Sequence, residues 1–284
     1  MLKPINRKSM KIRASGRSSD FISPSFGFGC LLNCSYCYMK RHMKEGLNYA
    51  TNLDDILLAI DNHVKNVSIN KPNQTDPDYI TYDISCNEDF ALHSKYYDWQ
   101  YIFEYFVSHD KAKATLATKI IPNNFLSYDP SNKVRIRFSL MPQKLSSVLE
   151  PNTSLIYDRL KAVNTFIDAG YDVHLNFSPV VVYEDWLHEY SKLFEQVNSL
   201  VRYKDKVKAE VIFLTHNKNK HEYNKQESLG DESLLWQPEI QEAKVSQYGG
   251  DNIRYQWELK NQFIHQFKTL HNKIIPWNTI RYIF

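Results

Sequence analysis

The stretch Gly29-Cys-Leu-Leu-Asn-Cys-Ser-Tyr-Cys-Tyr38 holds three of the four cysteines of this 284-residue chain. Cys30, Cys34 and Cys37 follow a CxxxCxxC spacing, and a tyrosine stands on each side of Cys37. The fourth cysteine, Cys86, is isolated. Three clustered thiols make no useful disulfide framework in a chain this long, and cytosolic thiols are normally reduced. The pattern therefore indicates metal or redox chemistry.

Thiolates separated by two and three residues on one loop can converge on a single metal centre. A structural zinc site needs four ligands, usually as two separated pairs, and the sequence has no second pair. A 4Fe-4S cubane also has four irons, so three local cysteines leave one iron open. The amino and carboxylate groups of S-adenosylmethionine can chelate that iron, and this cofactor is a recognised source of radical chemistry. We therefore expect Cys30, Cys34 and Cys37 to bind a 4Fe-4S cluster that works with S-adenosylmethionine.

The composition is that of a globular protein. Hydrophobic residues make up 43% of the chain, which is enough to bury the core of one large domain. The first residues are basic, and no run of about 18 apolar residues occurs, which argues against a signal peptide or a membrane span. We therefore expect a cytoplasmic protein without a membrane partner.

Residues 1–20 are expected to form a basic N-terminal arm, followed by one domain over residues 21–284. Two interpretations of the arm stay open. It can be a frayed, solvated terminus, or it can contact phosphates, since clusters of Lys and Arg supply the sequence-independent part of nucleic-acid affinity. Six basic residues precede the first acid, Asp20: Lys3, Arg7, Lys8, Lys11, Arg13 and Arg17.

Strand and helix patterns alternate along most of the chain. Short apolar or alternating runs predict strands, and amphipathic patterns predict helices between most of them. This alternation predicts an α/β fold with a parallel sheet, either open or curled into a barrel. The turn signal YGGDN near residue 250 interrupts this alternation and predicts a C-terminal β-hairpin, about 244–257. A helix is predicted after it, near 258–272. The predicted strands are 80–86, 113–119, 134–140, 173–179 and 208–214.

Several segments together resemble the spore photoproduct lyase family, which belongs to the radical S-adenosylmethionine superfamily. The resemblance covers residues 26–284 and lies in GCLLNCSYCY, DISCNED, TKI at 118–120, RIRFSL at 135–140, FLTHNK and the closing IRYIF. It implies a partial (β/α)6 barrel of the TIM type, with the cysteine loop after the first strand. The active site would lie at the C-terminal mouth of the barrel, as barrel enzymes generally arrange it.

The family's activity implies a function for this chain. The resemblance implies a radical lyase that repairs the methylene-bridged thymine dimer in DNA through a 5'-deoxyadenosyl radical. Cys86 occupies the place of the cysteine that gives a hydrogen atom to the product radical. Tyr36 and Tyr38 match two tyrosines that would relay the hydrogen atom back toward the cofactor. An electron donor such as flavodoxin or ferredoxin would reduce the cluster.

The resemblance also implies binding residues. Lys119 and Ser139 would contact S-adenosylmethionine, since a lysine can meet its carboxylate and a serine hydroxyl can bond its polar atoms. Asp83 and Asp89 flank Cys86 and would hold the methionine amine or the ribose, although capping or loop hydrogen bonds explain them equally well. In the hairpin, Arg254 and Tyr255 would contact the flipped bases, because such enzymes must take a base out of the stack. A phosphate contact is expected for Lys244.

Two alternatives to lesion repair stay open. The same initial radical formation can serve the tailoring or isomerisation of a hypermodified thymine base in DNA. The chain can also be an iron-sulfur nucleic-acid binding protein without turnover. Cys86 separates these readings, because a hydrogen donor is expected for repair, optional for tailoring and without purpose in a binding protein. Glu88 departs from the family pattern, which has a small serine two residues beyond the donor cysteine.

Overall fold

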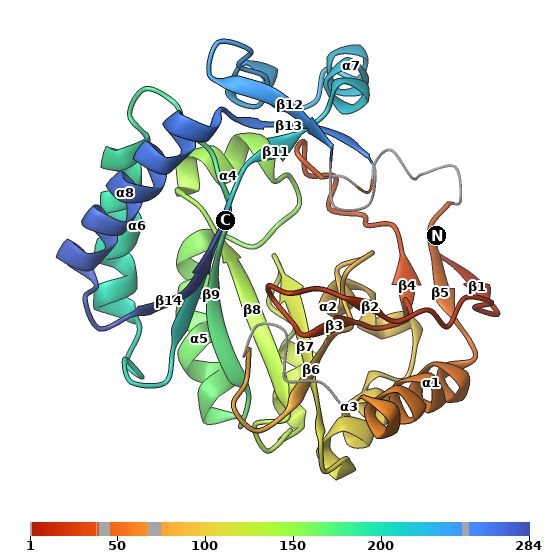
Figure 1. Cartoon of the computed structure of the whole chain (residues 1–284). Helices are drawn as coiled ribbons and strands as arrows, with labels where there is room; N and C mark the ends of the chain where they lie inside the picture. The colour runs from red at the N-terminus through yellow and green to blue at the C-terminus, as the bar shows by residue number, and fades with distance from the viewer. Residues whose placement is uncertain (1, 38, 40–45, 68–74, 246–249) are drawn as a thin grey trace.

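The main sheet has eight strands in the order β14-β10-β9-β8-β7-β6-β3-β2. All neighbours in it are parallel except β2 and β3, and the sheet curls into an open half-barrel (Figure 1). The computed structural model describes residues 2–37, 39, 46–67, 75–245 and 250–284. The strands of this sheet are β2 (Arg13–Ala14), β3 (Phe21–Ile22), β6 (Ile80–Asp83), β7 (Ala112–Thr118), β8 (Val134–Leu140), β9 (Asp172–Val180), β10 (Lys208–Phe213) and β14 (Thr279–Ile283).

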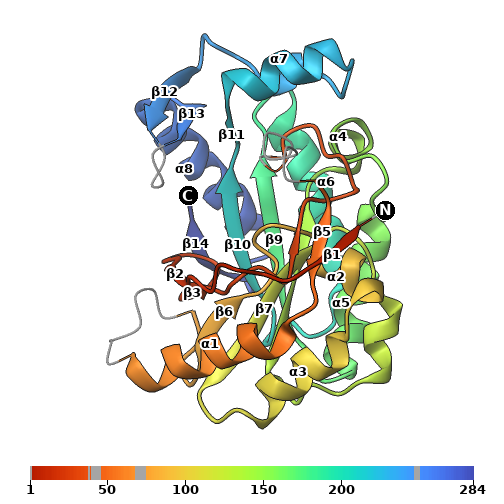
Figure 2. The ribbon, with the colours of Figure 1, turned by 90° about the vertical axis from the view of Figure 1, so that its right-hand side faces the viewer.

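Helices cover the outer face of the curled sheet (Figures 1 and 2). The longest is α8, which packs beside α6 at the end of the sheet that holds β10 and β14. The α-helices are α1 (Leu53–Asn66), α2 (Phe90–His93), α3 (Trp99–Ser108), α4 (Gln143–Leu149), α5 (Ile156–Asp168), α6 (Trp186–Leu200), α7 (Lys218–Gln226) and α8 (Trp257–Ile274); 3-10 helices are η2 (Ser94–Tyr96), η3 (Asn123–Ser127) and η4 (Glu232–Leu234).

The predicted partial (β/α)6 barrel is confirmed. β3 and β6 to β10 are the six parallel strands of the barrel, β14 adds a further parallel strand beside β10, and the five strands predicted from the sequence correspond to β6 through β10. Two details differ. The connection from β7 to β8 contains the 3-10 helix η3. The predicted strand 80–86 ends at Asp83 instead of 86, because the Asp83 carboxylate accepts a hydrogen bond from the Ser85 backbone N–H at 2.9 Å and turns the chain.

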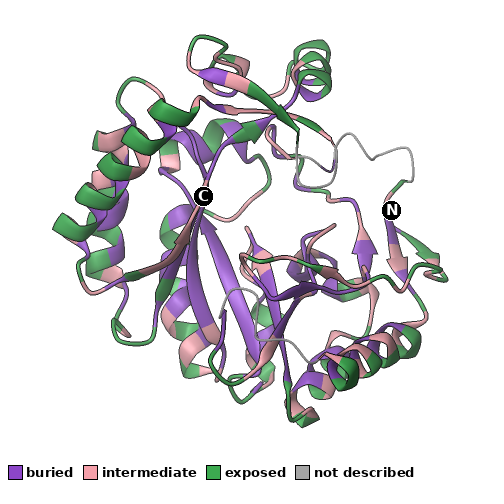
Figure 3. Ribbon diagram, in the orientation of Figure 1, coloured by how far each residue is buried: buried purple, intermediate pink, exposed green. Residues whose placement is uncertain are grey.

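Strand β8 explains how the sequence divides the two faces of the sheet. Side chains alternate along a strand, so one set points to the helices and the other into the barrel. Phe138 packs edge-on against Phe166 of α5, whereas Arg137 and Ser139 line the interior. Figure 3 shows the result: the central strands of the main sheet are mostly buried, and the helices that cover them are exposed mainly on their outer sides. The barrel interior is therefore polar, while the apolar core lies between the sheet and the helices.

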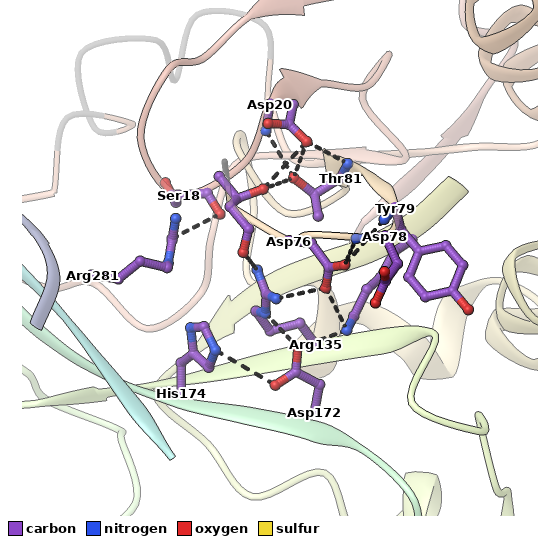
Figure 4. Close-up of polar contacts among 12 residues, drawn as sticks. Ser18, Asp20, Asp76, Asp78, Tyr79, Thr81, Arg135, Asp172, His174 and Arg281 are labelled. Carbon is purple, nitrogen blue, oxygen red and sulfur yellow. Dashed lines mark hydrogen bonds and ion pairs between the residues drawn. The ribbon is translucent and has the colours of Figure 1, made fainter. Parts of the chain in front are cut away.

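An ion-pair network fills the barrel at the N-terminal ends of its strands (Figure 4). Arg135 pairs with Asp76 at 3.0 Å and with Asp172 at 2.6 Å, and Lys113 lies 2.9 Å and 2.8 Å from the same two carboxylates. Burial opposes the ionisation of Asp172, but the charges of His174, Arg135 and Lys113 outweigh it and hold the pKa of Asp172 well below its usual range. The network closes this end of the barrel, so the opposite end is the mouth.

The N-terminal arm is fixed to the barrel. β1 (Lys3–Ile5) pairs in parallel with β5 (Asn48–Ala50), and β2 pairs with β3. β5 also pairs with β4 (Gly27–Phe28), which makes a small separate sheet. At the other end of the arm, the Arg281 guanidinium donates to the Arg17 carbonyl oxygen at 3.1 Å, and the Arg17 guanidinium lies 3.2 Å from the centre of the Phe284 ring. The interpretation as a frayed terminus is therefore wrong.

The C-terminal hairpin and the helix after it are both present. β12 (Gln241–Val245) pairs antiparallel with β13 (Asp251–Tyr255), and β11 (Thr215–His216) adds a third strand on the other side of β13. Helix α8 follows directly at Trp257. No helix among the described residues is long and apolar enough to cross a membrane.

Candidate active site

A cavity of about 380 Å³ opens at the mouth of the barrel. Its wall is made by the cysteine loop on one side and by the residues that end or follow strands β6 to β10 on the other. The cavity brings together nine of the residues predicted from the sequence: Cys30, Cys34, Tyr36, Cys37, Asp83, Cys86, Asp89, Lys119 and Ser139. The predicted residue Tyr38 lies outside the described part of the chain.

The cysteine loop is anchored from both sides. The Cys37 backbone N–H donates to the Cys34 carbonyl at 3.1 Å, which closes the CxxC half into a turn. The Ser35 backbone N–H donates to the Leu149 carbonyl at 2.9 Å, at the end of α4. From the opposite side, the side-chain amide of Asn224 donates to the Ser35 carbonyl at 2.7 Å. The loop therefore holds its thiols in place through contacts with α4 and α7.

Two thiols of the cysteine loop keep their protons unless a metal displaces them. None of the four cysteines forms a disulfide. Burial raises the pKa of Cys30 and of Cys34 to about 12, so both thiols stay protonated without a positive partner. Metal coordination removes the proton from a thiol outright. Three convergent thiols of this kind are the donor set that an iron-sulfur cluster needs, and they therefore fit the expected 4Fe-4S cluster.

Lys119 supplies a cation beside the cysteine loop. Burial lowers the pKa of its ammonium group, but the negative charges around it, including those of Glu150 and Asp89, outweigh burial and raise that pKa. The backbone N–H of Lys119 donates to the Asp89 carboxylate at 3.0 Å, and the Thr118 hydroxyl donates to the same carboxylate at 2.9 Å. The Lys119 ammonium group is thus charged, and the backbone that carries it is fixed directly after β7.

Asp89 has a structural task in this arrangement. Besides the bonds from Thr118 and Lys119, its carboxylate accepts the Leu92 backbone N–H at 3.1 Å and caps helix α2. These bonds are the capping and loop contacts that the sequence left open for this residue. Asp89 still lines the cavity, so its carboxylate also sets the local charge there.

Asp83 is paired with an arginine that the sequence analysis did not single out. The Arg137 guanidinium lies 2.8 Å from the Asp83 carboxylate and 3.6 Å from that of Glu210. Arg137 lines the cavity and is almost fully buried. The alternation in RIRFSL is the signal that reveals it, because Arg137 stands two residues before Ser139 and so shares its face of the strand.

Ser139 and Asn176 form a polar pair on the cavity wall. The Asn176 side-chain nitrogen lies 3.3 Å from the Ser139 hydroxyl oxygen, and both residues are buried. The Asn176 side-chain oxygen is buried and has no hydrogen-bond partner among the described residues. Buried polar atoms are normally satisfied. This orphaned acceptor, aimed at the cavity lining, fits a polar cofactor such as S-adenosylmethionine, whose amino group can donate to it.

Tyr36 joins the cysteine loop to a buried ion pair. Its hydroxyl donates to the Glu150 carboxylate, which in turn pairs with Arg159 at 3.0 Å. Burial raises the pKa of the Tyr36 phenol well above its usual value, and the charge of Glu150 adds to this. The phenol is therefore protonated, and its hydroxyl is held by the hydrogen bond to the Glu150 carboxylate. Glu150 was not predicted, because it lies 114 residues away in the sequence.

Glu88, the departure from the family pattern, is buried in the cavity wall. Its carboxylate lies 2.9 Å from His93 Nδ1 and accepts a hydrogen bond from the Tyr97 hydroxyl at 3.3 Å. Burial raises the pKa of Glu88. A Cβ at Gly27 would lie 2.1 Å from a Glu88 carboxylate oxygen, so the larger side chain depends on a glycine opposite.

The three predicted DNA contacts lie in the hairpin, outside the cavity lining. Lys244 is exposed, and Arg254 pairs with Glu242 of the facing strand at 3.1 Å. Tyr255 is completely buried: its hydroxyl accepts the Val182 backbone N–H at 2.8 Å, and its ring packs against Phe263. The expectation that Tyr255 contacts a base is wrong for this structure, because side chains alternate along β13 and this one faces the core.

Comparisons with known proteins identify the family of this chain. The family model described as Spore photoproduct lyase matches residues 5–284. A spore photoproduct lyase of Clostridium acetobutylicum is 26% identical over 266 residues, 90% of this chain and 74% of the relative. One from Bacillus subtilis is 26% identical over 197 residues, 68% of this chain but only 55% of the relative.

Solved structures show the same fold. A spore photoproduct lyase double mutant with bound AdoMet and dinucleoside spore photoproduct has a TM-score of 0.88 and 18% identity, and the match covers 100% of this chain and 82% of that one. A spore photoproduct lyase complexed with dinucleoside spore photoproduct has a TM-score of 0.87, 20% identity and the same coverage. The family match over nearly the whole chain settles its membership: this protein belongs to the spore photoproduct lyase family.

Proposed function

We propose that this protein is a radical S-adenosylmethionine lyase that repairs spore photoproduct, the methylene-bridged thymine dimer, in DNA. One observation carries the proposal: Cys86 opens into the same cavity as Cys30, Cys34 and Cys37. Three thiols on one loop suit a 4Fe-4S cluster, and a fourth thiol from a different strand end suits a hydrogen donor. The family membership and the names of the relatives point to the same reaction.

Each cofactor has a candidate set of residues in the cavity. Cys30, Cys34 and Cys37 would ligate the cluster. The Lys119 ammonium group would meet the carboxylate of S-adenosylmethionine, and Ser139 with Asn176 would bond its polar atoms. When bound, the cluster and S-adenosylmethionine supply a carbon-centred radical that abstracts a hydrogen atom from the thymine dimer.

Cys86 would complete the repair. After the methylene bridge breaks, the thymine methylene radical takes the hydrogen atom of the Cys86 thiol, and the sulfur becomes a thiyl radical. Cys86 is half-buried at the cavity wall, so its thiol is near the substrate and shielded from bulk solvent. Tyr36, and Tyr38 beyond the described residues, would return a hydrogen atom to the thiyl. The neighbouring Glu150 carboxylate would hold the Tyr36 phenol in position.

Repair is favoured over the alternatives by this same thiol. Tailoring of a modified thymine does not require a hydrogen donor, and a binding protein without turnover needs neither Cys86 nor Lys119. Reduction of the cluster needs an electron, for which we propose a flavodoxin or ferredoxin in the cytoplasm as the donor.

The test is an anaerobic repair assay. The reconstituted protein is given dithionite, S-adenosylmethionine and a synthetic dinucleoside spore photoproduct, and mass spectrometry follows repaired thymidine and 5'-deoxyadenosine. We expect both products. Deoxyadenosine without repaired thymidine would redirect the proposal to modified thymines. The absence of both products would contradict a radical enzyme and would favour the binding function.

A further inference from the structure

We propose that a second pocket, built by the N-terminal arm, binds the phosphate backbone of the DNA strand next to the lesion. This inference rests on the proposed function, since it assumes that the damaged base enters the cavity beside Cys86. The pocket has a volume of about 330 Å³. Three of its lining residues are cationic, and no Asp or Glu is found among the described residues that line it. Its polar lining includes Arg7, Lys11, Arg13, Ser25 and Asn87.

The position of this pocket connects it to the active site. Asn87 lines it, and the preceding residue, Cys86, lines the catalytic cavity. The Asn87 carbonyl accepts the Gly29 backbone N–H at 2.9 Å, and the Asn87 side chain donates to the Ser25 hydroxyl. Residues 86–87 therefore form a fixed wall between the catalytic cavity and the second pocket. A strand that places a base against Cys86 has its adjoining phosphates at this wall.

The basic side chains belong to an ordered part of the molecule. The Arg7 guanidinium donates to the Ser25 carbonyl and to the Asn48 side chain, each at 2.9 Å, and the Arg7 backbone N–H donates to Asn52 at 2.7 Å. Arg13 lies on β2, which pairs with β3 of the main sheet. A pre-ordered cationic surface loses less conformational entropy on binding than a frayed one. The arm thus presents its charges at a constant distance from the cavity.

The chemistry of the lining suits a phosphodiester. Arginine and lysine neutralise phosphate charge, and serine hydroxyls and asparagine amides donate hydrogen bonds to its oxygens. Such contacts position a duplex and carry no sequence information, as a repair enzyme for one lesion in any sequence requires. Figures 1 and 2 place the arm and the hairpin in different parts of the surface, so the arm adds a contact region separate from Lys244 and Arg254.

The first measurement is the affinity for an undamaged, fluorescein-labelled duplex by anisotropy, over a series of salt concentrations. We compare Lys11→Ala/Arg13→Ala with a control of equal charge loss, Lys204→Ala/Lys206→Ala, in the exposed loop before β10 at the opposite end of the barrel. The arm variant should bind about tenfold more weakly near 0.1 M salt, and its log–log salt slope should shrink by about two units, one per lost phosphate contact. A slope equal to that of the control would overturn the proposal.

The second measurement separates this inference from the proposed function. A dinucleoside spore photoproduct carries no flanking phosphates, so the arm variant should repair it at the wild-type rate, which also shows that the variant is folded. At DNA concentrations below saturation, the arm variant should repair the same lesion inside a duplex about tenfold more slowly than the wild type. Equal loss on both substrates would overturn the backbone site. Failure of the wild-type protein on the dinucleoside would instead contradict the proposed function and leave the duplex-binding result as an independent test of the pocket.

Discussion

The side-chain amide of Asn224 donates a hydrogen bond to the backbone carbonyl of Ser35 at 2.7 Å, across 189 residues of sequence. Ser35 stands between two of the predicted cluster ligands, Cys34 and Cys37. Asn224 is buried and also donates to Glu232 of η4. Helix α7 therefore acts as a support for the cysteine loop, although it lies outside the barrel strands.

Removal of this support should weaken retention of the iron-sulfur cluster. In Asn224→Ala the Ser35 carbonyl loses its buried partner, at a cost of about 1 to 3 kcal/mol. We expect less iron per protein after reconstitution and gel filtration, with faster loss of the charge-transfer absorbance. Lys225→Ala, an exposed neighbour on the same helix, is the control. Equal iron content in both variants would contradict the supporting role.

The two classes of cysteine should separate by product. Cys30→Ala removes a predicted cluster ligand and should abolish formation of 5'-deoxyadenosine. Cys86→Ala should keep that cleavage but divert the product radical to adducts, because no thiol remains to quench it. Mass spectrometry of the products distinguishes the two outcomes. Equal loss of cofactor cleavage in both variants would contradict the donor role of Cys86.

Lys119 should act on cofactor binding. A hydrogen bond to a charged group contributes about 1.5 to 3 kcal/mol, which corresponds to about 10- to 100-fold in affinity. We expect Lys119→Ala to raise the KM for S-adenosylmethionine by that factor, measured by the rate of deoxyadenosine formation. Lys111→Ala, just before the other end of β7, should leave the KM unchanged. An unaltered KM in Lys119→Ala would exclude the predicted contact with the carboxylate.

Tyr36→Phe tests the relay. The substitution keeps the ring but removes the hydroxyl that donates to Glu150. Repair in a single turnover should proceed, because Cys86 starts with its hydrogen atom, and later turnovers should slow about tenfold or more, within the range of a lost proton-transfer partner. Quantified repair against enzyme equivalents gives the answer. Tyr223→Phe on the surface of α7 is the matched control, and identical progress curves for the two variants would count against the relay.

The barrel network predicts how stability depends on pH. The pKa of Asp172 is lower in the folded protein than in the unfolded chain. Its ionisation therefore stabilises the fold above the unfolded value of about 4, and this contribution is lost as the pH falls through that range, from about pH 5 downward. Loss of the carboxylate in Asp172→Asn leaves Lys113 and Arg135 undercompensated, and we expect it to lower the free energy of unfolding at pH 7 by about 3 to 5 kcal/mol.

Denaturant titrations between pH 3 and 7 check this prediction. The free energy of unfolding of Asp172→Asn should depend less on pH than that of the wild type. The exposed Asp205→Asn removes the same charge at the surface and should change stability by less than about 0.5 kcal/mol. If the stability of Asp172→Asn fell with pH as steeply as that of the wild type, other carboxylates would control the pH dependence.

Much of the fold and of the site follows from the sequence because the relevant signals are local. Strand β8 can be read from RIRFSL alone, since alternation fixes which face Ser139 occupies. The three thiols of the cysteine loop lie within eight residues, so their spacing already implies a shared centre. Cys86 was placed by its position after a predicted strand, because the carboxyl ends of parallel strands meet at one mouth, whereas Lys119 was implied by the resemblance to the family.

Other features depend on contacts between distant parts of the chain. Tyr255 and Arg254 are neighbours in the sequence, but only the packing of β13 on the core decides that the tyrosine is buried and the arginine is not. The basic arm has the composition of a frayed terminus, and its pairing with β3 and β5 makes it part of the fold.

The sequence by itself determined the cysteine loop, the order of strands and helices, and the residues at the strand ends, because spacing and periodicity act over a few residues. Only the tertiary structure decided that Arg137 pairs with Asp83, that Glu150 holds Tyr36, and that Asn224 supports Ser35. These partners lie 54, 114 and 189 residues apart. No local pattern can specify such pairs, because they form only when the curled sheet has brought its loops to one mouth.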